Sequence, residues 1–126
     1  MIEHYRRDIR ERAFQYSLGA IKLYHALQEA KDGAGWVIGK QFLRAATSIG
    51  ANVEEAQAGE TRADFVHKYG IAQKEARETI YWLGLLAEGA IMPKRRLTPL
   101  MKETEEIYAV ITAIIRSAKN GSKTKG

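Results

Sequence analysis

The stretch from Gln41 to Leu86 constrains the fold most, because its apolar and small residues recur at alternating steps of four and three. This spacing places them on one stripe of an α-helix that packs lengthwise on a neighbour. The stripe contains Phe42, Ala46, Ile49, Val53 and Ala56 in the first half and Phe65, Tyr69, Ala72, Ala76, Thr79, Leu83 and Leu86 in the second. Because only a few residues separate the halves, we predict an antiparallel helical hairpin.

The same spacing recurs on both sides of this hairpin. We predict helices over about residues 8–31, 36–58, 62–88 and 98–118, with Asp8 as the first N-cap and Asn120-Gly121 closing the last helix. The outer stripes contain Ile9, Ala13, Tyr16, Ala20, Leu23, Leu27 and Ala30, then Leu100, Thr104, Ile107, Ile111, Ile114 and Ala118. No segment alternates with period two. The prediction is all-α, an antiparallel up-down-up-down four-helix bundle over residues 1–118, followed by a disordered basic tail over residues 119–126.

Composition excludes several classes of function. The chain of 126 residues has no cysteine, which removes disulfides, thiolate metal sites and a cysteine nucleophile. No apolar run approaches the length of a bilayer span, and the charged N-terminus lacks the apolar region of a secretion signal. We therefore expect a cytoplasmic protein without a membrane partner or a cofactor. The net charge is +5, and the last eleven residues contain four cations and no acid.

Two polar stripes run beside the apolar stripes of the inner helices. The first contains Arg44, Ser48, Asn52 and Glu55, and the second contains Glu75 and Glu78 next to Trp82. In an antiparallel pair the two stripes would face each other, so Arg44 and Asn52 could hydrogen-bond with Glu75 or Glu78. A solvated face is the simplest interpretation, a buried network that fixes helix register is the next, and a ligand or catalytic site is the third.

Apolar residues also occur away from the main stripes, among them Ile21, Tyr24, Leu85, Tyr108, Val110 and Ile115. A bundle of four helices has no deeply central helix, so these residues favour self-association. We expect Tyr24, Trp82 and Ile115 at a homo-oligomer interface.

Two enzymatic interpretations are weak. A di-metal carboxylate bundle needs two Glu-x-x-His pairs, and the nearest match is a single Asp64-x-x-His67, so we expect no metal. A HEPN-like, metal-independent ribonuclease would need an arginine and a histidine four to six residues apart, which Arg62 and His67 provide. Such a spacing is common in a chain with 20 cations, so we predict no enzymatic activity.

The central stretch resembles a known family. Arg44, Ala45, Ala46, Ser48, Ile49, Asn52 and Glu55 fall on the helix 2 signature Q-[LI]-R-R-A-A-x-S-I-x-x-N-I-A-E-G of the 23S rRNA intervening-sequence proteins. Asp64-Phe65, Ile71-Ala72, Glu75-Ala76, Glu78-Thr79 and Tyr81-Trp82-Leu83 are similar to its helix 3. Ala56 and Glu54 depart from the signature, in place of a glycine and a small residue.

The resemblance implies an antiparallel four-helix bundle that assembles into a ring-like homopentamer, without established catalytic residues. A related branch of the family comprises the accessory proteins of diversity-generating retroelements, which associate with a reverse transcriptase and nucleic acid. We therefore expect a homo-oligomer with possible electrostatic contact to RNA or DNA, and a reverse-transcriptase accessory subunit is the alternative. The cations expected to contact nucleic acid are Lys94, Arg95, Arg96, Lys119, Lys123 and Lys125.

Overall fold

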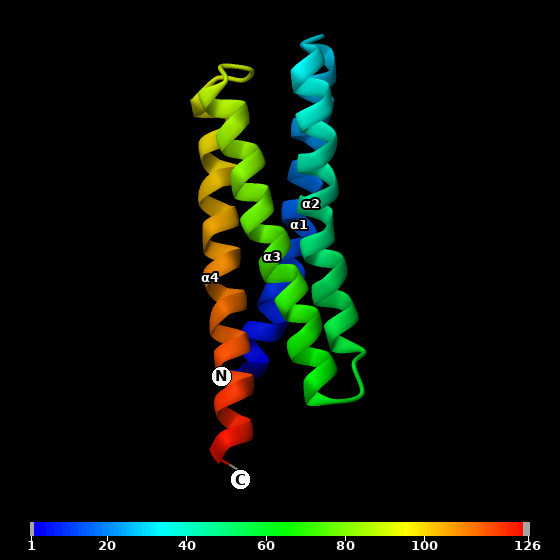
Figure 1. Ribbon diagram of the computed structural model, residues 1–126, viewed down its shortest axis with the longest axis vertical. Coiled ribbons are helices and arrows are strands. Elements are labelled where there is room, and N and C mark those ends of the chain that lie inside the picture. The colour runs from blue at the N-terminus through cyan, green and yellow to red at the C-terminus, as the bar shows by residue number, and fades with distance from the viewer. Residues whose placement is uncertain (1, 125–126) are drawn as a thin grey trace.

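Four long helices form the molecule. The computed structural model describes residues 2–124, with side chains described for residues 9–121. The helices are α1 (Ile2–Glu29), α2 (Gly33–Gln57), α3 (Arg62–Glu88) and α4 (Lys94–Thr124). They run lengthwise and alternate in direction (Figure 1), with the closest packing between α2 and α3 and the loosest between α1 and α4. The predicted up-down-up-down four-helix bundle is confirmed.

The core is built from the predicted stripes. Nearly all of their members are buried, and the largest fully buried side chains include Phe42, Ile49, Tyr69, Leu83 and Ile111. Ala30 is exposed, because α1 ends at Glu29. Leu97 and Met92 are buried although the sequence placed them in a loop. The reason is that α4 begins at Lys94 and brings its first turn under the end of α3.

Side-chain caps position the two inner helices. Asp32 precedes α2 and accepts a hydrogen bond from the backbone N–H of Gly35 at 2.8 Å. Thr61 precedes α3 and accepts one from the backbone N–H of Asp64 at 3.0 Å. These bonds satisfy amide groups that have no partner within the helix. The α3 helix therefore has the predicted bounds, ending before Gly89.

The outer helices are longer than predicted. Asp8 lies inside α1, which begins at Ile2, so its predicted role as an N-cap is wrong. Asn120-Gly121 does not end α4, which continues to Thr124, so residues 119–124 are helical rather than a disordered tail. The side chain of Lys123 and the whole of Lys125 lie outside the described residues.

Two mid-helix glycines face neighbouring helices. A Cβ at Gly50 on α2 would lie 3.5 Å from Ala13 and Ser17 on α1, and one at Gly19 would lie 3.6 Å from Leu100 on α4. These are ordinary van der Waals distances, so neither position requires glycine. The turn residues Lys31 and Ala90 have positive φ angles of 53° and 55°, a region that favours glycine.

Candidate interaction surfaces

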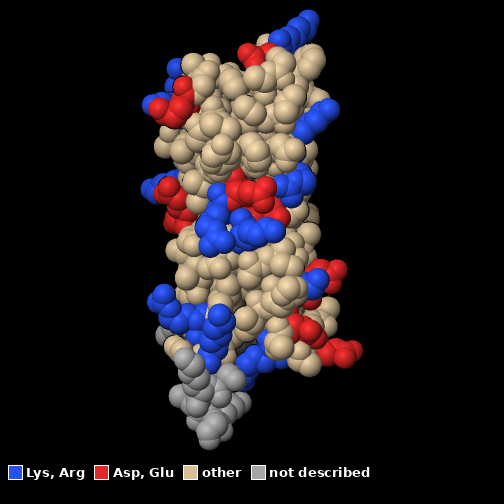
Figure 2. Space-filling model, in the orientation of Figure 1, with Lys and Arg blue, Asp and Glu red and all other residues tan. Residues whose placement is uncertain are grey.

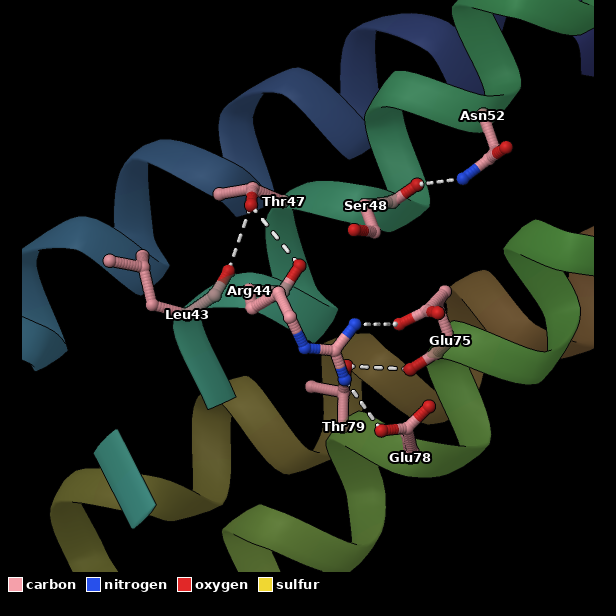
Figure 3. Close-up of polar contacts among 8 residues, drawn as sticks. All are labelled: Leu43, Arg44, Thr47, Ser48, Asn52, Glu75, Glu78 and Thr79. Carbon is pink, nitrogen blue, oxygen red and sulfur yellow. Dashed lines mark hydrogen bonds and ion pairs between the residues drawn. The ribbon is translucent and has the colours of Figure 1, made fainter. Parts of the chain in front are cut away.

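Arg44 joins the two inner helices through the polar stripes (Figure 3). Its Nη2 lies 2.6 Å from Oε1 of Glu78, and its Nη1 lies 3.3 Å from Oε2 of Glu75. The Glu75 side chain is only 9% exposed, whereas that of Arg44 is 50% exposed. The arginine therefore neutralises a carboxylate that has little access to water, and this ion pair fixes the register of α2 against α3.

The other members of the polar stripes lie differently. Asn52 donates from Nδ2 to the backbone carbonyl of Ser48 at 2.8 Å, within its own helix (Figure 3), rather than to Glu75 or Glu78. Glu55 is exposed and lines a shallow hollow at the α2–α3 turn. The stripes thus supply one interhelical network, centred on Arg44.

The three residues expected at an oligomer interface are half-buried. Trp82 and Ile115 pack against the core of their own chain, and Tyr24 accepts a hydrogen bond from Gln28 at 2.9 Å. Trp82 Nε1 is the one buried side-chain nitrogen or oxygen without a hydrogen-bond partner among the described residues. Only the outer edges of these side chains are free to meet another molecule.

Other large apolar side chains are more exposed, and the sequence analysis missed most of them. Seven are between 36% and 65% exposed, namely Phe14, Leu18, Ile21, Trp36, Val37, Tyr81 and Leu85. Of these seven, only Ile21 and Leu85 were identified from the sequence as apolar residues away from the main stripes. The position around the helix could have identified the others, because Phe14 and Leu18 lie roughly 140–180° away from the buried stripe of α1 at about 100° per residue.

The described cations expected to contact nucleic acid lie at opposite ends of the bundle. Lys94, Arg95 and Arg96 form the first turn of α4, and Lys119 lies about 35 Å further along the same helix at 1.5 Å per residue. Lys94 pairs with Glu88 at 2.9 Å. At the same end as Lys119, the guanidinium of Arg62 lies beside Gly121. Its Nη1 would be 3.8 Å from a Cβ added to that glycine. Figure 2 shows blue atoms gathered toward this lower end and a charged belt across the middle of the face.

Arg62 and His67 do not meet at a common site. The Arg62 guanidinium lies beside α4, whereas His67 lines the hollow at the α2–α3 turn together with Glu55 and Lys68. They are five positions apart in α3, which turns the two side chains about 140° apart around the helix. A HEPN-like ribonuclease site formed by Arg62 and His67 therefore has no geometric support.

The described residues contain no group of three or more His, Asp or Glu side chains that could hold a metal ion. None of the described helices is long and apolar enough to cross a membrane. A cleft of about 480 Å³ lies between α1 and α4, the two helices that pack most loosely. Its lining includes the Arg12–Glu103 ion pair, whose atoms are 2.8 Å apart.

Comparison with known proteins agrees with this architecture. The family model described as 23S rRNA-intervening sequence protein matches residues 6–113. A similar solved structure is that of a protein of unknown function from the S23 ribosomal protein family of Bacteroides thetaiotaomicron. It is 33% identical with a TM-score of 0.83, and the match covers 89% of this chain and 98% of that chain. No curated protein matches the chain.

Proposed function

This chain belongs to the family of 23S rRNA-intervening sequence proteins, and on that premise we propose that it is a non-enzymatic assembly protein. In this proposal the protein forms a homo-oligomer through apolar surface. The family resemblance implies that the homo-oligomer is a pentamer. It contacts nucleic acid through unpaired surface cations. No residue of the chain is assigned a catalytic role in this proposal.

The observation that carries the self-association is the set of seven exposed large apolar side chains. The interior is already filled by the four apolar stripes, so these seven side chains have no place in the core of their own chain. Removing them from water is favourable by roughly 25 cal/mol for each Å² of apolar surface. Clustered exposed apolar side chains mark surfaces that bind a partner.

Sedimentation equilibrium over a dilution series tests the self-association. We expect one species several times heavier than the 14.2 kDa chain, dissociating only at high dilution. A mass of one chain at all concentrations would contradict the proposal, because the seven side chains would then remain in water.

The charge distribution supports the contact with nucleic acid. Arg10 pairs with Glu54, Arg12 with Glu103 and Arg44 with Glu75 and Glu78. Another set of cations has no ion-pair partner among the described residues and is exposed: Arg62, Arg95, Arg96, Arg116 and Lys119. Unpaired cations release the counterions of phosphate groups when they bind, and this contribution is independent of sequence.

Fluorescence anisotropy of a labelled single-stranded RNA across a salt series tests this contact. We expect the logarithm of the binding constant to fall linearly with the logarithm of salt concentration. Arg116→Gln should lower the slope by about 0.7, the contribution of one phosphate contact on a single strand. The matched control is Arg10→Gln, which removes a cation already neutralised by Glu54 and should leave the slope nearly unchanged. A binding constant that is insensitive to salt would contradict the electrostatic account.

A further inference from the structure

The seven exposed apolar side chains fall into two patches on two faces of the bundle that share α2. We define the first patch as Phe14, Leu18, Ile21 and Trp36, on the α1–α2 face, and the second patch as Val37, Tyr81 and Leu85, on the α2–α3 face. We propose that the first patch of one copy packs against the second patch of the next copy, head to tail. This inference rests on the proposed self-association and specifies the surfaces that it uses.

The first patch follows the outward side of α1, next to α2. Phe14, Leu18 and Ile21 recur at steps of four and three, so they stand on successive turns of one face. Arg10, on the same side, reaches Glu54 of α2 at 3.0 Å. The indole of Trp36 donates to the backbone carbonyl of Gln28 at 3.1 Å, which holds the ring on the α1 side of α2. A hollow of about 260 Å³ beside Phe14 gives room for a side chain from a partner.

The second patch lies on the other side of α2. Val37 follows Trp36 directly and is therefore turned about 100° further around the helix. Arg44 lies beside Glu78, so the antiparallel register of α2 and α3 brings Val37 to the level of Leu85, seven residues away in each helix. Tyr81 is one turn from Leu85 on the outward side of α3 and is 60% exposed. Figure 2 shows that bands with few charged side chains flank the charged belt on this face.

The size of the faces fits a second copy as the partner. Two adjacent helices of 25 to 28 residues present a face about 40 Å long and about 20 Å wide, roughly 800 Å². A stable protein–protein interface buries about this area on each partner. Every copy carries both patches, so a head-to-tail contact between identical chains covers both without a further protein.

Symmetry favours the pairing of unlike patches. A two-fold dimer would pack one patch against itself and leave the other patch exposed in each copy. A head-to-tail contact buries both patches of every copy and repeats until the ring closes. Beside the patches, Arg10 is paired with Glu54 and Arg44 with Glu78 within the chain, whereas Lys22, Lys40 and Arg77 are exposed. The proposed contact is therefore mainly apolar, and we expect it to persist at high salt.

Complementation between two variants tests the pairing. Phe14→Glu/Leu18→Glu removes the first patch, and Val37→Glu/Tyr81→Glu removes the second. All four positions are at least 41% exposed, so circular dichroism should show intact helices. The control, Gln15→Glu/Ser117→Glu, adds the same charges at exposed positions outside both patches and should assemble like the wild type.

Native mass spectrometry then measures the masses of the assemblies. Each patch variant alone should be a monomer of about 14.2 kDa, and an equimolar mixture should give a dimer of twice that mass with one copy of each variant. The dimer forms because the mixture retains one intact first patch and one intact second patch, and it cannot grow further. A variant that dimerises alone, or a mixture that stays monomeric while the wild type assembles, would overturn the head-to-tail pairing. A monomeric wild type would instead overturn the self-association itself.

A second measurement does not depend on the charged variants. The chain has no cysteine, so Leu18→Cys and Leu85→Cys in separate copies create one possible cross-link between the two patches. Oxidation should join the two variants to each other in high yield. Cross-linking of the Leu18→Cys variant mainly to itself would contradict the pairing of unlike patches.

Discussion

Tyr16 on α1 donates its hydroxyl proton to the hydroxyl oxygen of Thr104 on α4 inside the core. The direction follows from Thr104, which uses its own proton on the carbonyl oxygen of Leu100 at 2.6 Å. Both residues are buried, and the bond lies between the two helices that pack most loosely. This directed hydrogen bond predicts that the two partners are not equivalent when each is replaced.

Thr104→Val should destabilise the fold more than Tyr16→Phe. Valine leaves the buried Tyr16 hydroxyl without an acceptor, which costs about 1–3 kcal/mol. Phenylalanine leaves Thr104 still bonded to Leu100, so the loss is about 0.5–1.5 kcal/mol. Urea unfolding of the two variants measures the difference. Equal losses, or a larger loss for Tyr16→Phe, would contradict the assigned direction of donation.

Tyr16 should also make the fold sensitive to alkali. Burial raises the pKa of its hydroxyl well above the ordinary value of about 10. The folded state therefore keeps a proton that the unfolded state releases above about pH 10, so this part of the stability is complete below that pH and is lost as pH rises further. Free energies of unfolding measured between pH 8 and 11 should fall less steeply in Tyr16→Phe than in the wild type. Parallel curves would show that Tyr16 does not contribute.

Arg44 should stabilise the bundle mainly through Glu75 rather than through Glu78. Arg44→Met leaves the nearly buried Glu75 carboxylate without its cation, and we expect a loss of about 1–3 kcal/mol, less than for a fully buried pair because Arg44 is half exposed. Glu78 is 35% exposed, so Glu78→Gln should cost less than about 1 kcal/mol. Urea unfolding of both variants, with the double variant to measure coupling, distinguishes the two contributions. A larger effect at Glu78 would assign the main role to the exposed pair.

Tyr81 and Trp82 are neighbours with opposite expected roles. Their rings meet edge to face with centroids 5.2 Å apart, but Trp82 packs on the core and Tyr81 is largely exposed. Trp82→Ala should therefore lower the stability of the fold by about 2 kcal/mol or more. Tyr81→Ala should change it by less than about 0.5 kcal/mol yet weaken self-association. Thermal unfolding and solution mass, measured on both variants, check the two effects separately. Loss of folding in Tyr81→Ala would place that residue in the core instead.

Helix α3 was predictable because local and tertiary preferences agree in it, whereas α2 begins at Gly33, three residues before its predicted start. Thr61 marks the start of α3 and Gly89 marks its end, on either side of the buried stripe. The capping residues and the apolar spacing therefore give the same bounds. Asp8 and Asn120-Gly121 are similar signals within the outer helices, but the chain continues helical past them. A polar residue or a glycine is tolerated inside a helix whose backbone hydrogen bonds continue on both sides.

The surface was less predictable, because the spacing of residues along the sequence does not show which sides of each helix pack against its neighbours. Tyr24 and Ile115 lie within about 60° of the buried stripe, so they fall into grooves between helices. Phe14, Leu18 and Tyr81 lie roughly 140° or more from it and therefore face outward. The pairing of Arg44 with Glu75 and Glu78 follows from the antiparallel register. The bond from Asn52 to its own helix does not, because the Asn52 amide can reach the backbone carbonyl of Ser48 one turn earlier and bonds there instead.

The most direct test of the central claim is the solution mass of the wild-type protein, stripped of nucleic acid and measured by light scattering at low and high salt. Self-association through the two apolar patches predicts a mass several times 14.2 kDa that does not change with salt, and the family resemblance implies five copies. A monomer at both salt concentrations would contradict it, as would an assembly that high salt dissociates.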